Sequence, residues 1–269
     1  MKRILFLAGV AIPVAFLVLT AGRAGDGTAT PWKPFLPADA YAELSKRSIA
    51  GIEATAKSGV KDAAERIEAE AAILVGYTLS VKNPGDEAIG KMRGAAILAV
   101  QATRSGELKK LAAFGATIAP AAPNAAADKT PRKIYIQELS WVMEMFKGKS
   151  KGGEGLHAEL QYHPKLKNLN GIEALIGALS AKKLSEENLA KVEKQLPLLA
   201  YRMAVVGAIT HEFAPQKGAG QWRELSSQMR DASITLADAA GKKNGDGVLK
   251  AAVSLENSCT QCHSAFKGK

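Results

Sequence analysis

The chain of 269 residues has little cysteine and few aromatic side chains: it contains two cysteines, and aromatics make up 6%. Two cysteines are too few for the disulfide framework that stabilises small secreted domains. Hydrophobic residues make up 47%, chiefly Ala, Leu, Ile and Val, whereas Gly and Pro number 25 and 11. This composition excludes a collagen-like or wholly disordered chain. We therefore expect one or two helical domains, each with its own core.

Neither sign of charge is gathered into one block, although the net charge is +10. Basic and acidic residues alternate, as in Glu65-Arg66-Ile67-Glu68. Mixed charges are typical of solvated helix faces, whereas a nucleic-acid surface needs clustered basic residues. We expect no nucleic-acid partner. A protein partner with an acidic docking surface is an alternative that the sequence leaves open.

Long apolar runs are absent after residue 20. The one such run, Ile4 to Thr20, follows Lys2 and Arg3 and precedes the small residues Ala21-Gly22-Arg23-Ala24. This order predicts a signal peptide over residues 1–24 and an exported, periplasmic protein. The alternative is a retained membrane anchor, because about 17 apolar residues are at the short limit of a membrane span.

Two tetrapeptides recur at the same offset of 120 residues. Gly51-Ile52-Glu53-Ala54 returns as Gly171-Ile172-Glu173-Ala174, and Phe146-Lys147-Gly148-Lys149 returns as Phe266-Lys267-Gly268-Lys269. A shared offset near both ends of the repeat indicates an internal duplication. We divide the chain into units at 31–149 and 157–269, with the Gly/Lys-rich stretch 147–155 as a loose linker.

Apolar residues three or four positions apart predict helices throughout, with no competing strand pattern. The fold class is therefore all-α, with two tandem four-helix-bundle units. We expect Ser185 to cap a helix and Pro197 to kink or restart it. The predicted helices cover about 38–57, 60–82, 86–114 and 132–147 in the first unit, and 172–179, 185–213, 222–241 and 247–269 in the second.

Both cysteines lie in Cys259-Thr260-Gln261-Cys262-His263, the C-x-x-C-H pattern of covalent haem attachment. On a helix, residues i, i+3 and i+4 share a face, so the two thiols can form thioethers while His263 coordinates iron. The alternatives are a thioredoxin-like redox pair or a zinc site completed by another histidine. An export signal favours haem c, one per chain, because this haem is attached outside the cytoplasm.

The second unit resembles the class II c-type cytochromes, the cytochrome c-prime family, over residues 185–269. The resemblance lies in Trp222 through Leu236 and Leu249 to Cys259, in the closing Ser264-Ala265-Phe266-Lys267, and in Tyr201-Arg202-Met203 with Val206. It implies that Arg202 holds a haem propionate and that Val206 or Met203 faces the iron, Met203 being the candidate distal ligand. The alternatives are an exposed helix charge for Arg202 and a core stripe for Met203 and Val206.

In the first unit, the offset places Leu139, Val142 and Met143 where Cys259, Cys262 and His263 stand in the second. We therefore expect a haem-free first bundle that covers the haem unit or presents a docking face.

The function that follows is single-electron transfer by an exported mono-haem cytochrome, with a redox protein as partner and homodimer formation open. The alternative is a five-coordinate haem protein that binds nitric oxide or carbon monoxide. We expect no enzymatic activity, because a peroxidase needs a distal acid–base pair and His211 is the lone candidate. His157 and His163 receive no chemical role.

Overall fold

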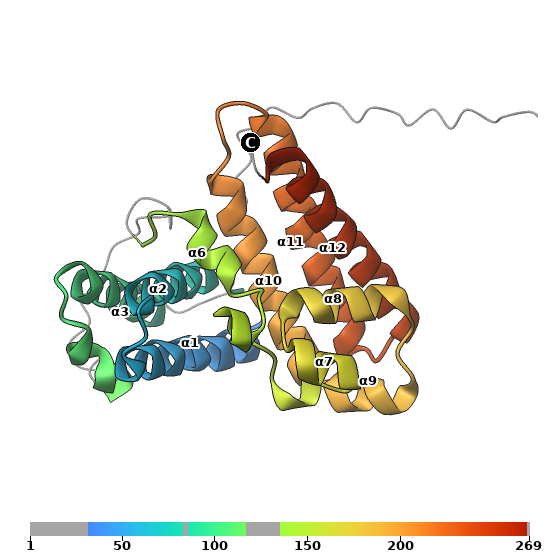
Figure 1. Cartoon of the computed structure of the whole chain (residues 1–269), viewed down its shortest axis with the longest axis horizontal. Helices are drawn as coiled ribbons and strands as arrows, with labels where there is room; N and C mark the ends of the chain where they lie inside the picture. The colour runs from blue at the N-terminus through green and yellow to red at the C-terminus, as the bar shows by residue number, and fades with distance from the viewer. Residues whose placement is uncertain (1–31, 83–85, 117–134, 268–269) are drawn as a thin grey trace, which may run out of the picture.

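The computed structural model describes residues 32–82, 86–116 and 135–267, and these residues form helices and irregular connections without a β-strand (Figure 1). The all-α fold class is therefore confirmed. The predicted signal peptide and most of the predicted loop 115–131 lie outside the described residues.

Three helices form one side of the molecule (Figure 1): α1 (Ala38–Ser58), α2 (Ala63–Ser80) and α3 (Asp86–Arg104). They match the first three predicted helices, except that the third is interrupted. Gly106 adopts a left-handed φ of 74°, which glycine permits without a Cβ clash, and the 3-10 helix η1 (Leu108–Ala113) follows it. The centre of this group is α2, which packs against both α1 and α3 and has a nearly continuous run of buried side chains.

Short helices connect this group to the rest: α6 (Leu139–Glu144), η2 (Lys149–Lys151), η3 (Ala158–Leu160) and α7 (Pro164–Leu169). The prediction of a loose linker over 147–155 is wrong. Gly148 and Gly153 are buried, and a Cβ on either would collide with a backbone carbonyl oxygen. The glycines of this stretch therefore allow close backbone packing.

The remaining chain folds into α8 (Ile172–Ala181), α9 (Glu186–Val192), α10 (Gln195–Glu212), α11 (Ala219–Gly241) and α12 (Gly245–Phe266). Ser185 Oγ accepts a hydrogen bond from the Asn188 N–H at 3.3 Å, which confirms the predicted helix cap. The helix restarts at Gln195, so that Pro197 lies in a first turn, where its missing N–H costs little.

Successive helices α10, α11 and α12 run antiparallel, and α11 packs against both neighbours (Figure 1). The next contact of α12 is with α8, which lies across it, and α10 also packs on α2. At that crossing Gly76 allows close approach, because a Cβ there would collide with Val205 Cγ1. Buried side chains of both predicted units belong to one continuous core, while the division into two units stays a prediction.

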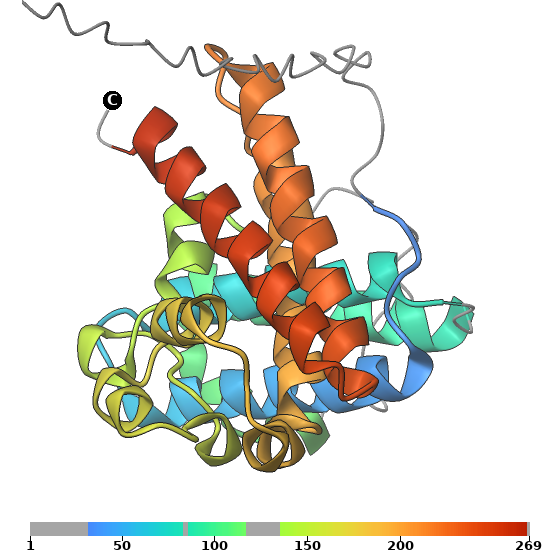
Figure 2. The same cartoon turned by 90° about the vertical axis from the view of Figure 1, so that its right-hand side faces the viewer.

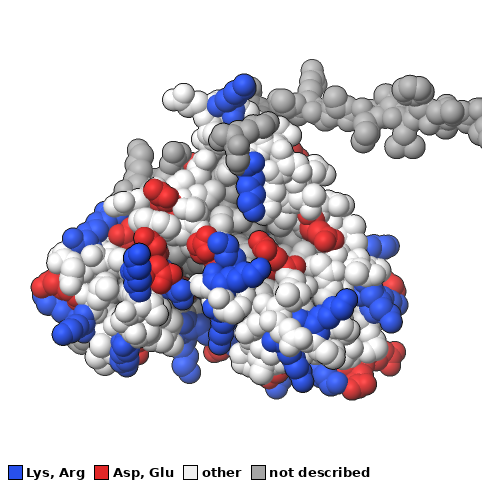
Figure 3. All heavy atoms as spheres, in the orientation of Figure 1, with Lys and Arg blue, Asp and Glu red and all other residues white. Residues whose placement is uncertain are grey.

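On the face of the molecule shown in Figure 3, charges of both signs are interspersed over the lower part, and the upper part, formed by α10, α11 and α12, carries fewer. This distribution agrees with the solvated helix faces expected from the sequence.

Candidate functional site

The cysteine motif lies on the last two turns of α12. The helix begins at an Asn244 cap, whose Oδ1 accepts a hydrogen bond from the Gly247 N–H at 3.0 Å, and it continues as one helix through Phe266. Its buried stripe consists of Val248, Ala251, Ala252, Leu255 and Ser258. The partly buried Cys259 and Cys262 continue that stripe, whereas Thr260 and Gln261 are exposed, as the helical spacing predicts.

Helix α8 covers α12 only as far as the motif. Ser180 Oγ donates a hydrogen bond to Glu256 Oε2 at 2.5 Å, and the Glu173 carboxylate, in the first turn of α8, is close enough to act on the Cys259 thiol. Helix α8 begins at Ile172, and the last turn of α12 extends past this end of α8 (Figure 2). On that turn Cys262 is half-buried and His263 is exposed.

Both thiols are free and protonated at neutral pH. Burial raises the pKa of Cys259 to about 11, with smaller contributions from Cys262 and the carboxylates Glu173 and Glu256, and burial also raises the pKa of Cys262. A redox pair of the thioredoxin type instead needs a lowered thiol pKa, commonly at a helix N-terminus. Here the pair lies at a helix C-terminus, where the helix dipole disfavours a thiolate.

The end of α12 is fastened to the corner between α10 and α11. The ring of Phe266 meets the ring of Trp222 edge-on, with centroids 5.0 Å apart and an interplanar angle of 79°. Trp222 Nε1 donates a hydrogen bond to the Thr210 carbonyl oxygen at 2.7 Å. Phe266 also packs over Gly218, whose left-handed φ of 80° begins α11. Both aromatic residues belong to the stretch that carries the family resemblance, but their contact could not be predicted from their spacing along the chain.

Met203 and Val206 are almost completely buried on α10, with exposed fractions of 1% and 0%. Their burial agrees with the core-stripe alternative and leaves the distal role untested. Arg202 is also buried, so the alternative of an exposed helix charge is wrong.

The Arg202 guanidinium lies in a cluster of polar groups at the crossing of α2 and α10. Its Nη2 contacts the carboxylates of Glu70 and, at 3.1 Å, Glu154, while Nη1 donates hydrogen bonds to Tyr77 Oη at 3.0 Å and Ser48 Oγ at 3.2 Å. Burial raises the pKa of Tyr77 to about 12, so that its hydroxyl stays protonated. Two of these four side-chain partners, Glu70 and Tyr77, come from α2.

The other three histidines differ in their surroundings. Burial lowers the pKa of His211, and the neighbouring Arg223 and Arg230 lower it further. His157 and His163 cap η3 and α7, each accepting a backbone N–H at Nδ1. No three His, Cys, Asp or Glu side chains lie close enough to hold a metal ion together within the described residues, so the zinc alternative has no ligand set there.

The three counterparts of the motif in the first unit lie on α6. Val142 is fully buried, and Leu139 and Met143 pack against the core. The helix has six residues, against the expected 132–147, of which 132–134 lie outside the described residues.

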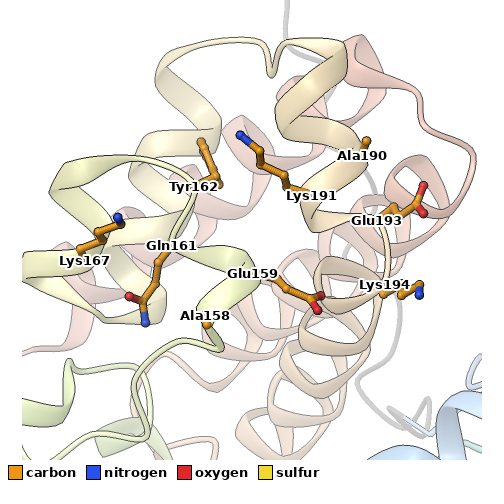
Figure 4. Close-up of a pocket in the computed structure, with 9 residues that line it drawn as sticks. All are labelled: Ala158, Glu159, Gln161, Tyr162, Lys167, Ala190, Lys191, Glu193 and Lys194. Carbon is orange, nitrogen blue, oxygen red and sulfur yellow. The ribbon is translucent and has the colours of Figure 1, made fainter.

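A cavity of about 580 Å³ opens between η3, α7 and α9, away from the motif (Figure 4). Lys191 extends toward Tyr162, while Glu193 and Lys194 are directed away from the opening. Lys191 also pairs with Glu187 at 2.5 Å, so the charges do not converge on one point. The lining consists of Ala158, Glu159, Gln161, Tyr162, Lys167, Ala190, Lys191, Glu193 and Lys194.

Comparison with protein-family models, with characterised proteins and with solved structures finds no match for this chain. Within the described residues, no helix has both the length and the apolar character needed to cross a bilayer.

Proposed function

We propose that this protein is an exported c-type cytochrome that carries one haem, bound through Cys259 and Cys262 with His263 as axial ligand, and that it transfers single electrons to and from a protein partner. The observation that supports it is the position of the motif: both thiols continue the inner stripe of the last helix, at the end that α8 leaves uncovered.

The state of the thiols supports attachment rather than disulfide exchange. Both have raised pKa values because they are partly buried, so they remain neutral thiols at physiological pH. Disulfide exchange depends on a thiolate and is therefore disfavoured at this position. Thioether formation, in which a thiol adds to a vinyl group of the haem, does not require the folded chain to stabilise a thiolate.

Each residue of the motif has a distinct task. Cys259 and Cys262 are one turn apart, about 4.5 Å along the helix axis, and would fix one edge of the haem to α12. The imidazole of His263 is exposed and has no hydrogen bond or ion pair with any described side chain, so it would be available to bind iron. The bound haem would supply the one-electron change, while the Trp222 and Phe266 contact keeps the end of α12 in place.

For the distal side we propose Met203 and Val206, as the family resemblance implies; both are buried on α10. Arg202 already contacts two carboxylates, so we propose that it fastens α10 to α2 rather than holding a propionate. The arrangement in tandem bundles rests on the shared offset of 120 residues.

The test is the double variant Cys259→Ala with Cys262→Ala, expressed with a haem-attachment system. We expect haem staining after denaturing electrophoresis to disappear completely. The matched control is His263→Ala, which should keep the stain, because both thioethers remain, but change the optical spectrum. Persistent staining of the double variant would refute the attachment site.

Carbon monoxide then separates electron transfer from gas binding. We expect the ferrous protein to show a low-spin spectrum that the gas leaves unchanged, because Met203 would complete the iron coordination. A high-spin spectrum that shifts on adding the gas would favour the five-coordinate alternative.

A further inference from the structure

The Arg202 guanidinium carries one positive charge but contacts two carboxylates. Its Nη2 contacts Glu70 on α2 and, at 3.1 Å, Glu154 in the connection between η2 and η3. Among the described residues, neither carboxylate has an ion pair with a second cation. The two carboxylates therefore share one counter-charge, and the cluster has one excess negative charge when both are ionised.

The cluster is enclosed, so that water screens this excess charge poorly. The side chain of Arg202 is 5% exposed and that of Glu70 is 18% exposed. Glu70 Oε2 is buried without a hydrogen-bond partner among the described residues. Because both carboxylates contact the same nitrogen, two of their oxygens lie within about 6 Å of each other, and at this separation one negative charge disfavours the other. Ionisation of both carboxylates is therefore costly.

The other charged and titratable groups around Glu154 do not supply the missing positive charge. Arg47 of α1 acts on Glu154 from a distance, but its Nε pairs with Glu43 at 2.8 Å. Tyr77 of α2 is a protonated hydroxyl at neutral pH, because burial raises its pKa to about 12. His157, on the same connection as Glu154, lines a small cavity with it. The balance at neutral pH thus depends on the two carboxylates themselves.

The carboxylate that solvent reaches is Glu154. It lines that cavity, of about 70 Å³, together with Arg202, and 45% of its side chain is exposed. The surrounding protein still limits its hydration, so that burial raises the pKa of Glu154; Arg202 opposes the rise and Glu70 adds to it. A proton from solvent can therefore enter the cluster at this side chain.

We propose that Glu70, Arg202 and Glu154 form a proton-binding site at the junction of α2, α10 and the connection between η2 and η3, in which the two carboxylates take up one proton between them as the pH falls. With the proton bound, the cluster is neutral and one carboxylate pairs with the guanidinium. Without it, the two carboxylates repel each other across the junction. The proton belongs to the pair, since two strongly interacting acids titrate together. This site does not depend on the haem.

The sign of the pH dependence follows from the raised pKa. The folded chain holds the proton above pH 4.5, the ordinary value for a glutamate, whereas the unfolded chain releases it there. The contribution of Glu154 to stability is therefore complete below pH 4.5 and is lost as the pH rises through the folded value. An ordinary pair of ionised partners gives the opposite trend, because its contribution is lost as the pH falls.

The test is urea unfolding of the parent, Glu154→Gln and Glu70→Gln between pH 5 and pH 8. Either substitution leaves one carboxylate for one guanidinium and so removes the proton site. We expect the unfolding constant of the parent, divided by that of either variant, to rise with pH by up to about tenfold per pH unit. At pH 8 neither variant should unfold more readily than the parent. A ratio that stays constant for either variant would overturn the proposal and show that both carboxylates remain ionised.

Two controls separate this site from other titrating groups. Asp62 pairs singly with Arg66 at 2.7 Å, and this hydrogen bond lowers the pKa of Asp62. The ratio for Asp62→Asn should therefore be constant between pH 5 and pH 8. His157→Gln should keep the pH response of the parent. A response that disappeared in His157→Gln and persisted in Glu154→Gln would assign it to the imidazole and overturn the proposal.

The double variant Glu70→Gln with Glu154→Gln tests whether the carboxylates share one charge. It leaves the buried Arg202 without a counter-charge and should raise the unfolding constant more than about a hundredfold, although neither single variant does so. A change equal to the product of the two single changes would show that the carboxylates act separately. If the double variant does not fold, the single variants still decide the question.

Discussion

Helices α6 and α12 stand at corresponding places in the proposed repeat, yet their surroundings are opposite. Val142 of α6 is fully buried, and the helix packs against α2. Its counterpart Cys262 is half-buried on a turn of α12 that extends past α8. A C-x-x-C-H motif needs room for a large cofactor beside the helix, and α12 has an open end where α6 is covered. The surroundings of α12 therefore suit the proposed haem attachment better than those of α6.

The largest difference in stability between α6 and α12 is expected at Val142, which is fully buried, and at its counterpart Cys262. We expect Val142→Asp to lower the free energy of unfolding by about 3–5 kcal/mol, because it places an unpaired charge in the core. The matched variant Cys262→Asp, in protein made without haem, should cost less than about 1.5 kcal/mol, since that site reaches solvent. Urea unfolding monitored by circular dichroism gives both values. Equal costs would show that the two helices do not differ in burial.

Local features of the fold could be predicted from the sequence because they depend on neighbours along the chain. The Ser185 cap, the helix restart close to Pro197 and the helical position of the cysteines all follow from spacing and residue type. Gly106 shows where this reasoning was incomplete, since its left-handed backbone breaks the predicted third helix.

Contacts between distant segments could not be predicted in the same way. Arg202 contacts Glu70 and Glu154, which come from separate segments, and the residue type at position 202 predicts neither contact. The Gly/Lys-rich stretch 147–155 resembled a linker in composition, yet its glycines allow backbone packing. Residue type alone does not distinguish a glycine that makes the backbone flexible from a glycine that allows two backbone segments to pack closely.

A smaller effect is expected where the end of α12 is fastened. Phe266→Leu keeps an apolar side chain but loses the edge-on contact with Trp222, which should cost about 0.5–1.5 kcal/mol. A double-mutant cycle with Trp222→Leu isolates the pair, because the second substitution should add little once Phe266 is gone. Strictly additive losses would mean that this contact does not hold the last turn in place.

The smallest effect concerns the pH dependence of the thiols in haem-free protein. Folding raises the pKa of Cys259 to about 11 because the thiol is buried, whereas in the unfolded chain it titrates near 9. The folded state therefore holds this proton to higher pH, so the contribution of Cys259 to stability is constant below about pH 9 and is lost as pH rises toward 11. Cys259→Ala should remove part of this fall, as measured by urea midpoints at pH 8 and pH 10.5. The α6 helix carries no thiol, so Leu139→Ala should leave the pH dependence unchanged. A fall of equal size in Cys259→Ala would assign it to other groups and show that Cys259 is not buried enough to resist ionisation.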